Sequence, residues 1–210
     1  MPTLFFSVAG DTSTYVPTCA VTLSATGTQK QWPLATCENG RELLEFLVRE
    51  METATLVSFG GASFGLRALR TLVPDAANTI SRIAYDHVDL MHLFVVDNGY
   101  RAPLASFNAT DASSKPRPSD AALDCERVVR DLEAAHAMAC SRGVLMRTAK
   151  SGQIFPWFIR QELEEPPITL PTVRESLQRI QRAPQWIRDP LSKTTGLEWL
   201  ETAQLHPSHD

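Results

Sequence analysis

The sequence predicts an α/β fold. We expect a mixed sheet with three antiparallel strands followed by an α-β-α-β segment, with helices flanking the sheet and an irregular extension at the C-terminus. Short apolar runs separated by turn-sized gaps occupy residues 3–34, and apolar residues then recur at helical spacing between further short apolar runs. The chain has 210 residues, of which 43% are hydrophobic, so it is long enough to build a sizeable core.

Three strands are predicted at the start of the chain. They cover Thr3–Val8, Tyr15–Leu23 and Thr28–Leu34. The turn residues around Gly27 are typical of a hairpin loop between the second and third of them. Because short loops join antiparallel neighbours, these strands are expected to form a meander.

The pattern then changes to alternating helices and strands. Asn39 is the expected N-cap of a helix whose apolar residues span Leu43–Met51. Thr55–Phe59 predicts a fourth strand, and Ser63–Leu72 predicts a helix. A fifth strand is expected near the centre of Ile80–Leu90. This alternation favours a parallel crossover unit.

A short helix and a long helix are expected next. Asp89 is the expected cap of the helix Leu90–Val95. Residues 106–120 are polar and indicate a loop. Ala121–Ala139 then shows the longest helical periodicity of the chain, and Gly143 is expected to end that helix.

The character of the chain changes near its C-terminus. Residues 1–164 are expected to form one domain, and residues 165–210 a proline-rich extension with short helices. The expected capping boxes in the extension pair Thr172 with Glu175 and Thr195 with Glu198. Trp186 and Trp199 stand in weakly apolar surroundings. They either anchor the extension on the domain or bind a partner protein.

Composition narrows the class of protein. The net charge is −4 and the isoelectric point is about 5.7, so a basic surface over the whole molecule is excluded. No apolar run reaches the length of about 20 residues that crosses a bilayer, and the first residues do not resemble a signal peptide. The four cysteines lack the short spacing of a zinc site and are expected to be reduced thiols. We expect a cytoplasmic protein without membrane partners.

Several stretches together carry a resemblance to a known family. These are LFFSVAGD, LVSFGGASFGLRAL, VDLMHLF and DCERVV. In this order they resemble the ribonuclease-H-like fold, and within it the DnaQ-type 3′-5′ exonucleases similar to the proofreading domain of family B DNA polymerases. The resemblance covers residues 3–150.

In that family, four carboxylates hold two divalent metal ions that cleave a phosphodiester bond. The first Asp-x-Glu motif falls on Ser7 and Ala9, the Asn and Asp of the second on Gly60 and Gly65, and the third Asp on Val128. None of these residues carries a charge. The resemblance therefore implies a degenerate exonuclease without a metal cofactor.

Two other interpretations remain open at this stage. The glycines of SFGGASFG also suit an ordinary strand-to-helix turn in an unrelated α/β domain, because glycine tolerates positive φ. Alternatively, relocated acids rebuild a Mg²⁺ or Mn²⁺ site in an active exonuclease. The candidate acids are Asp11, Asp86, Asp89, Asp124 and Asp131.

A basic cluster along the long helix is the predicted nucleic-acid contact. Its members are Arg127, Arg130, Arg142, Arg147 and Lys150. An ordinary solvated helix face explains the same residues. The expected function is that of a catalytically inactive 3′-5′ exonuclease-like domain, acting as a nucleic-acid-binding or structural subunit of a larger complex. Its expected partners are other protein subunits and nucleic acid. The third hypothesis is a protein-interaction module that uses the C-terminal extension.

Overall fold

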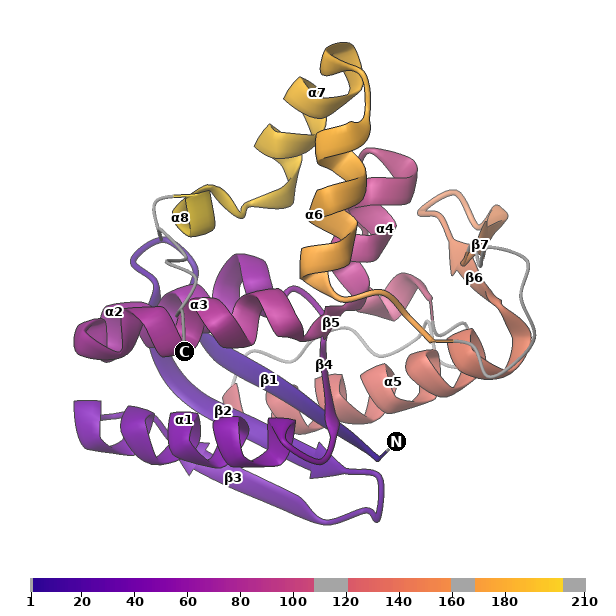
Figure 1. The fold of residues 1–210 in the computed structure, drawn as a ribbon. Helices are drawn as coiled ribbons and strands as arrows, with labels where there is room; N and C mark the ends of the chain where they lie inside the picture. Colours follow the sequence, from indigo (N-terminus) through magenta and orange to yellow (C-terminus); the bar gives the residue numbers. More distant parts are fainter. Residues whose placement is uncertain (1, 108–120, 160–168, 202–210) are drawn as a thin grey trace.

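A five-stranded mixed sheet forms the centre of the computed structural model, which describes residues 2–107, 121–159 and 169–201 (Figure 1). The strand order is β3-β2-β1-β4-β5. The strands are β1 (Thr3–Asp11), β2 (Val16–Ser24), β3 (Gln29–Pro33), β4 (Thr55–Ser58) and β5 (Val88–Asp89). β2 is antiparallel to β1 and β3, whereas β4 is parallel to β1 and β5. The predicted α/β class is confirmed.

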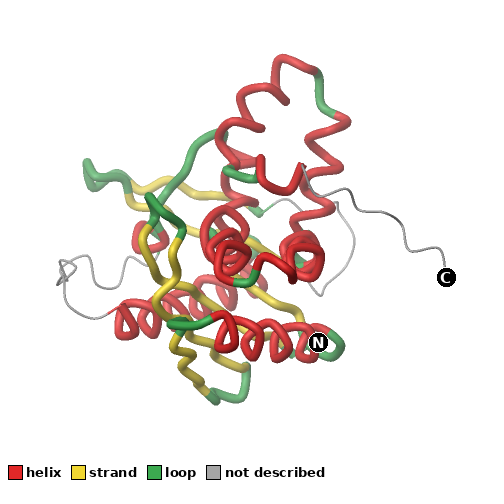
Figure 2. The backbone as a smooth tube through the Cα atoms, turned by 90° about the vertical axis from the view of Figure 1, so that its left-hand side faces the viewer, coloured by secondary structure: helices red, strands yellow, loops and turns green. Residues whose placement is uncertain are grey.

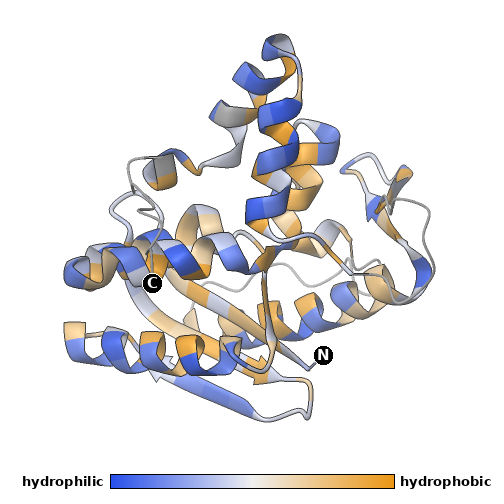
Figure 3. Cartoon of the chain, in the orientation of Figure 1, coloured by the Kyte–Doolittle hydropathy of each residue, from blue (hydrophilic) through white to orange (hydrophobic). Residues whose placement is uncertain are grey.

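Helices cover both faces of this sheet because β1 is apolar on both sides. Leu4, Phe6 and Val8 point to one face, which we call the first face, and Phe5 points to the other, the second face. Successive side chains of a strand alternate between faces, so an almost uninterrupted apolar run requires cover on each. Figure 3 shows hydrophobic residues along the strands and on the helix surfaces turned toward them.

Three helices pack on the first face. They are α1 (Cys37–Met51), α2 (Leu66–Leu72) and α3 (Ala77–Asp86). Leu43, Leu44 and Leu47 of α1 are fully or almost fully buried, since residues spaced by three and four positions share one side of a helix.

The second face is covered mainly by α5 (Ala121–Arg142), which lies across β1 and β2. Val129, Leu132 and Ala135 of α5 are fully buried there. The helix α4 (Leu90–Asn98) and a separate hairpin, β6 (Val144–Thr148) with β7 (Ile154–Phe158), extend this layer.

The described part of the C-terminal extension packs on the sheet layers and projects beyond them (Figure 2). It contains α6 (Val173–Arg182), α7 (Gln185–Thr195) and α8 (Glu198–Glu201). α6 and α7 pack on α4 around Val95, Ile180 and Leu191. Thr172 and Glu175 form the expected capping box at the start of α6.

Three local predictions are wrong. α1 is capped by Thr36, whose side chain accepts the N–H of Asn39 at 3.2 Å, so Asn39 lies inside the first turn. Most of Ile80–Leu90 is helical, and β5 has only two residues. Thr195 and Glu198 do not form a capping box, because Thr195 ends α7 and Gly196 follows it at φ +69°.

Other expectations are tested only in part. Most of the expected polar loop, residues 108–120, lies outside the described residues, as do residues 160–168 and 202–210 of the C-terminal region. Gly143 follows the end of α5 at φ +62°, as expected for a helix stop. Within the described part of the chain, no helix combines the length and the apolar character that crossing a membrane requires.

Candidate functional site

The first site residues lie where β1 meets α5 on the second face of the sheet. Ala9 of β1 is paired with Cys19 of β2, and Ala9, Cys19 and Val128 pack on the same apolar cluster as the buried Cys125. The Cys125 thiol is hydrogen-bonded to the side chains of Ser7 and Cys19. We call these five residues, Ser7, Ala9, Cys19, Cys125 and Val128, the β1–α5 patch. It presents hydroxyl, thiol and apolar groups and no carboxylate.

The buried Cys125 of this patch is a poor metal ligand. Burial, with a further contribution from Cys19, raises the pKa of Cys125 to about 12. A metal ligand or nucleophile must be the thiolate, so Cys125 stays protonated and inert at neutral pH. All four cysteines of the chain are free thiols.

Gly65 does not join the β1–α5 patch. It ends η1 (Gly61–Gly65), a π-helical turn that precedes α2. A Cβ atom at Gly65 would lie 3.1 Å from two side-chain carbons of Val8. Val8 belongs to the first-face cluster, whereas Ala9 packs on the second. The turn therefore has no room for a larger side chain without a shift of Val8, and β1 separates Gly65 from Ala9.

The candidate acids that the active-nuclease hypothesis requires are dispersed. Asp11 accepts the N–H of Ser13 at 2.8 Å, and its hydrogen bonds to Ser13 and Thr14 lower its pKa to about 2. Asp86 forms an ion pair with Arg174 at 2.9 Å, and Asp124 one with Arg127 at 3.5 Å. Asp131 belongs to α5. Across residues 2–107, 121–159 and 169–201, no three His, Cys, Asp or Glu side chains are grouped so that they could hold a metal ion.

Asp89 is a buried structural carboxylate. It accepts the backbone N–H groups of Gly60 and Ala62 at 2.8 and 2.9 Å, and those of Met91 and His92 at 3.0 and 3.2 Å. The prediction that Asp89 caps α4 is confirmed. The carboxylate also holds the turn after β4, where Gly60 has φ +77° and requires a glycine whatever the chemistry nearby.

Two buried histidines lie next to Asp89. His87 donates from Nδ1 to the carbonyl oxygens of Ile83 and Ala84, which leaves Nε2 to accept the hydroxyl of Ser58 at 3.0 Å. Burial lowers the pKa of His87, and it lowers that of His92 to about 4, so both rings are neutral at physiological pH. Ser58 and His87 resemble a nucleophile and its base, but both are fully buried and no substrate reaches them.

The predicted basic cluster is divided into two parts. Arg127 pairs with Asp124, and Arg130 donates to Gln29 of β3 at 3.4 Å. Arg142 lies 15 residues beyond Arg127, which corresponds to about 22 Å along α5. Arg147 lies on β6, and Lys150 lies just beyond the end of that strand. The five cations therefore do not form a single patch.

The two tryptophans of the extension have opposite environments. Trp199 is 8% exposed, packs in the first-face cluster and donates its indole N–H to the carbonyl oxygen of Ala62 at 2.9 Å. It anchors the extension, and a partner could reach it only by displacing this segment. Trp186 on α7 is 76% exposed.

A surface that the sequence did not indicate lies on the β6–β7 hairpin and on Tyr100. Its large apolar side chains are exposed, and Arg147 lies against two aromatic rings. The segment Ile154–Phe158 is a short run of apolar and aromatic residues that suits a strand, so the sequence carried a signal for the hairpin but none for its contact with Tyr100.

Comparisons of this chain with protein-family models, with curated proteins and with solved structures gave no match. The case for a function therefore depends on the residues and geometry described above.

Proposed function

We propose that this protein is a catalytically inactive relative of the DnaQ-type 3′-5′ exonucleases, which serves as a nucleic-acid-binding or structural subunit of a larger complex. The observation that carries the proposal is the uncharged β1–α5 patch, which contains Ser7, Ala9 and Val128, the residues onto which the sequence resemblance places three of the family's four carboxylates.

The strand arrangement supports this proposal. In the order β3-β2-β1-β4-β5, β2 is the one strand that runs opposite to the other four. Three antiparallel strands, a helical crossover to β4 and a second crossover to β5 are the order expected for a ribonuclease-H-like sheet. The long helix α5 returns across β1 and β2, where the third motif of the family would be expected (Figure 1).

The chemistry of the patch argues against phosphodiester cleavage. Mg²⁺ and Mn²⁺ are hard cations that require charged or strongly polar oxygen ligands, and two-metal hydrolysis needs several carboxylates to fix both ions. The β1–α5 patch supplies one hydroxyl, the two thiols of Cys19 and Cys125, and methyl groups, and the pKa of the Cys125 thiol is about 12. These groups cannot balance the charge of a pair of divalent ions.

Loss of the carboxylates is compatible with binding of nucleic acid. Four negative charges beside a phosphate backbone repel it unless metal ions neutralise them, whereas an uncharged patch does not. Affinity for nucleic acid then depends on cations elsewhere on the surface.

A cleavage assay tests the proposal. Purified protein is incubated with end-labelled single-stranded DNA and RNA in the presence of Mn²⁺, and we expect no more product than in a parallel reaction with EDTA. Degradation that EDTA abolishes, and that the variants Asp124→Asn and Asp131→Asn lose, would overturn the proposal in favour of relocated carboxylates. Degradation that also survives the substitutions Asp11→Asn and Asp86→Asn unchanged, and that EDTA does not abolish, would identify a contaminating nuclease.

A further inference from the structure

We propose that Tyr100, Arg147, Lys150 and Phe155, together called the Tyr100 surface, form a binding site for single-stranded nucleic acid. This inference specifies where the proposed nucleic-acid-binding subunit would bind its ligand, and it depends on that part of the proposed function. It concerns the outer half of the β6–β7 hairpin, which lies at one side of the molecule (Figure 1).

The pairing of the hairpin places an arginine and an aromatic ring side by side. Leu145 is paired with Trp157, and both are buried. Two residues farther along, Arg147 is paired with Phe155 on the same face, because side chains alternate along a strand. This face therefore begins in the core and ends in a cation next to an exposed ring.

Tyr100 completes the arrangement from the end of α4. The guanidinium carbon of Arg147 lies 5.0 Å from the centre of the Tyr100 ring and 5.9 Å from that of Phe155, and Arg147 donates to the Tyr100 hydroxyl at 2.7 Å. The edge-to-face contact between Tyr100 and the buried Phe94, at 5.2 Å, holds the tyrosine in place. Arginine stacked in this way is oriented without being neutralised.

The rings of this surface are unusually open to solvent. Tyr100 is 42% exposed and Phe155 is 40% exposed. Among the residues that the structure describes, eight large hydrophobic side chains are exposed; two of these are Tyr100 and Phe155, and three more, Met146, Ile154 and Phe158, lie on the opposite face of the hairpin. Exposed aromatic rings beside cations are the elements on which the bases of a single strand stack.

The local charge favours a polyanion. Residues 134–159 contain Arg142, Arg147 and Lys150 and no Asp or Glu. No carboxylate of the described residues lies within 4.0 Å of the Arg147 guanidinium, whose Nε is buried without a hydrogen-bond partner among them. The nearby Asp97 accepts the indole N–H of Trp157 at 2.9 Å. A phosphate can therefore pair with a cation here, while a base lies against Tyr100 or Phe155.

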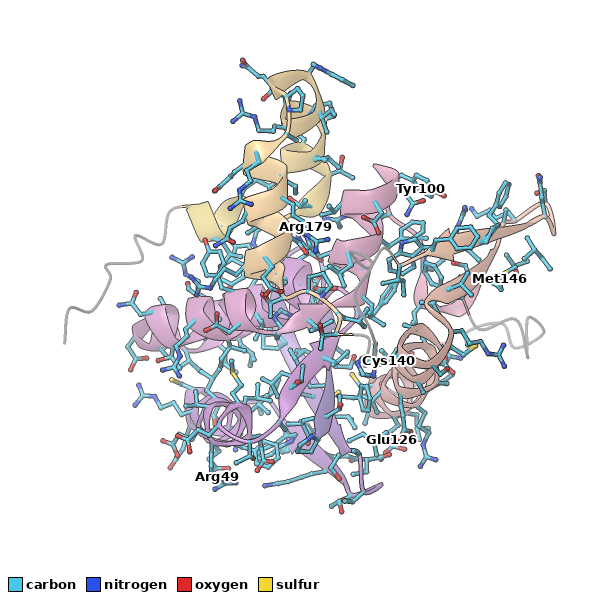
Figure 4. The ribbon with its side chains drawn as sticks, turned by 45° about the vertical axis from the view of Figure 1, so that its right-hand side comes forward. Arg49, Tyr100, Glu126, Cys140, Met146 and Arg179 are labelled. Atoms are coloured by element: carbon cyan, nitrogen blue, oxygen red, sulfur yellow. The ribbon has the colours of Figure 1, made fainter. Side chains whose placement is uncertain are left out.

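The opposite face of the hairpin serves as an internal control. It carries Met146, Ile154 and Phe158, which are apolar and exposed. Figure 4 shows Tyr100 and Met146 on opposite sides of the hairpin. A ligand that only binds apolar surface would prefer this opposite face of the hairpin. A single strand would prefer the face that carries the stacked Arg147.

Fluorescence anisotropy with a labelled oligothymidylate tests the site on the full chain. Phe155→Ala is expected to weaken binding about 5-fold or more at fixed salt, since one stacked base is lost. Tyr100→Leu, which keeps an apolar contact with Phe94, should weaken it similarly. Lys150→Gln should lower the slope of log affinity against log salt by about 0.7, as expected for one phosphate contact. Ile154→Ala, on the opposite face, should leave affinity unchanged.

The outcomes separate this inference from the proposed function. Wild-type binding that neither Phe155→Ala nor Tyr100→Leu weakens would overturn the Tyr100 surface and leave the proposed function in place. Equal affinity for duplex and single strand would also overturn it, because stacked duplex bases cannot reach the rings. If the wild-type chain does not bind the oligonucleotide, both the Tyr100 surface as a binding site and the nucleic-acid-binding role are refuted. The role as a structural subunit would then remain. Circular dichroism of each variant confirms that the fold is retained.

Discussion

Replacing Asp89 with asparagine is expected to lower the free energy of unfolding by about 3 kcal/mol or more. Asp89 is fully buried, and its two carboxylate oxygens accept four backbone N–H groups from the turn after β4 and from the start of α4. An asparagine of the same shape offers one acceptor oxygen and turns an N–H₂ group toward donors. Urea unfolding followed by circular dichroism measures the change.

Asp86→Asn is the matched control for this experiment. Asp86 lies three residues earlier and forms a partly exposed ion pair with Arg174. Such pairs contribute about 0–1 kcal/mol, so this variant should unfold close to the wild type. A loss below about 1 kcal/mol for Asp89→Asn would show that the buried carboxylate is not what holds the turn against α4.

Trp199→Ala is expected to lower the free energy of unfolding by about 3–5 kcal/mol, because it empties a large core site and removes the hydrogen bond to the carbonyl oxygen of Ala62. The substitution should also release the segment around α8 from α2 and α3. Limited proteolysis, read together with urea unfolding, would then show earlier cleavage near the C-terminus.

Trp186→Ala provides the comparison, since it removes the same side chain from a site that is 76% exposed. Its effect on stability should stay within about 0.5 kcal/mol. Similar losses for the two tryptophans would contradict the assignment of Trp199 as the anchor of the C-terminal extension.

The first four strands of the sheet could be predicted because the signal for each of them is local. β1 is apolar at successive positions, and a turn with Gly27 separates β2 from β3. The helix α3 was missed although Ile80, Ile83 and Ala84 have helical spacing, because β5 was expected in the same stretch. With only Val88 and Asp89, β5 is too short for a pattern of its own.

The site could be predicted only in part, because only contacts between residues that are close in the sequence leave a local pattern. The cap that Asp89 provides to α4 involves residues two and three positions away, and the sequence predicted it. Its bonds to Gly60 and Ala62 join residues 29 and 27 positions apart, so no local pattern reveals them. The same holds for Arg147 and Tyr100, which are 47 positions apart.

The prediction of the basic cluster failed in the opposite way, because residues that are close in the sequence lie apart in the structure. Its members are close in the sequence, but a helix rises about 1.5 Å per residue, so Arg127 and Arg142 lie about 22 Å apart along α5. Of the five predicted contacts, Arg147 lies against the rings of Tyr100 and Phe155, whereas Arg127 pairs with Asp124.

A count of bound Mn²⁺ shows whether the β1–α5 patch holds a pair of divalent ions. The wild-type chain is titrated with Mn²⁺ while electron paramagnetic resonance reports the free ion. We expect the free-ion signal to follow the total Mn²⁺ concentration as it does in buffer. Stoichiometric uptake of a pair of ions per chain, abolished when Ser7→Tyr fills the patch, would contradict it.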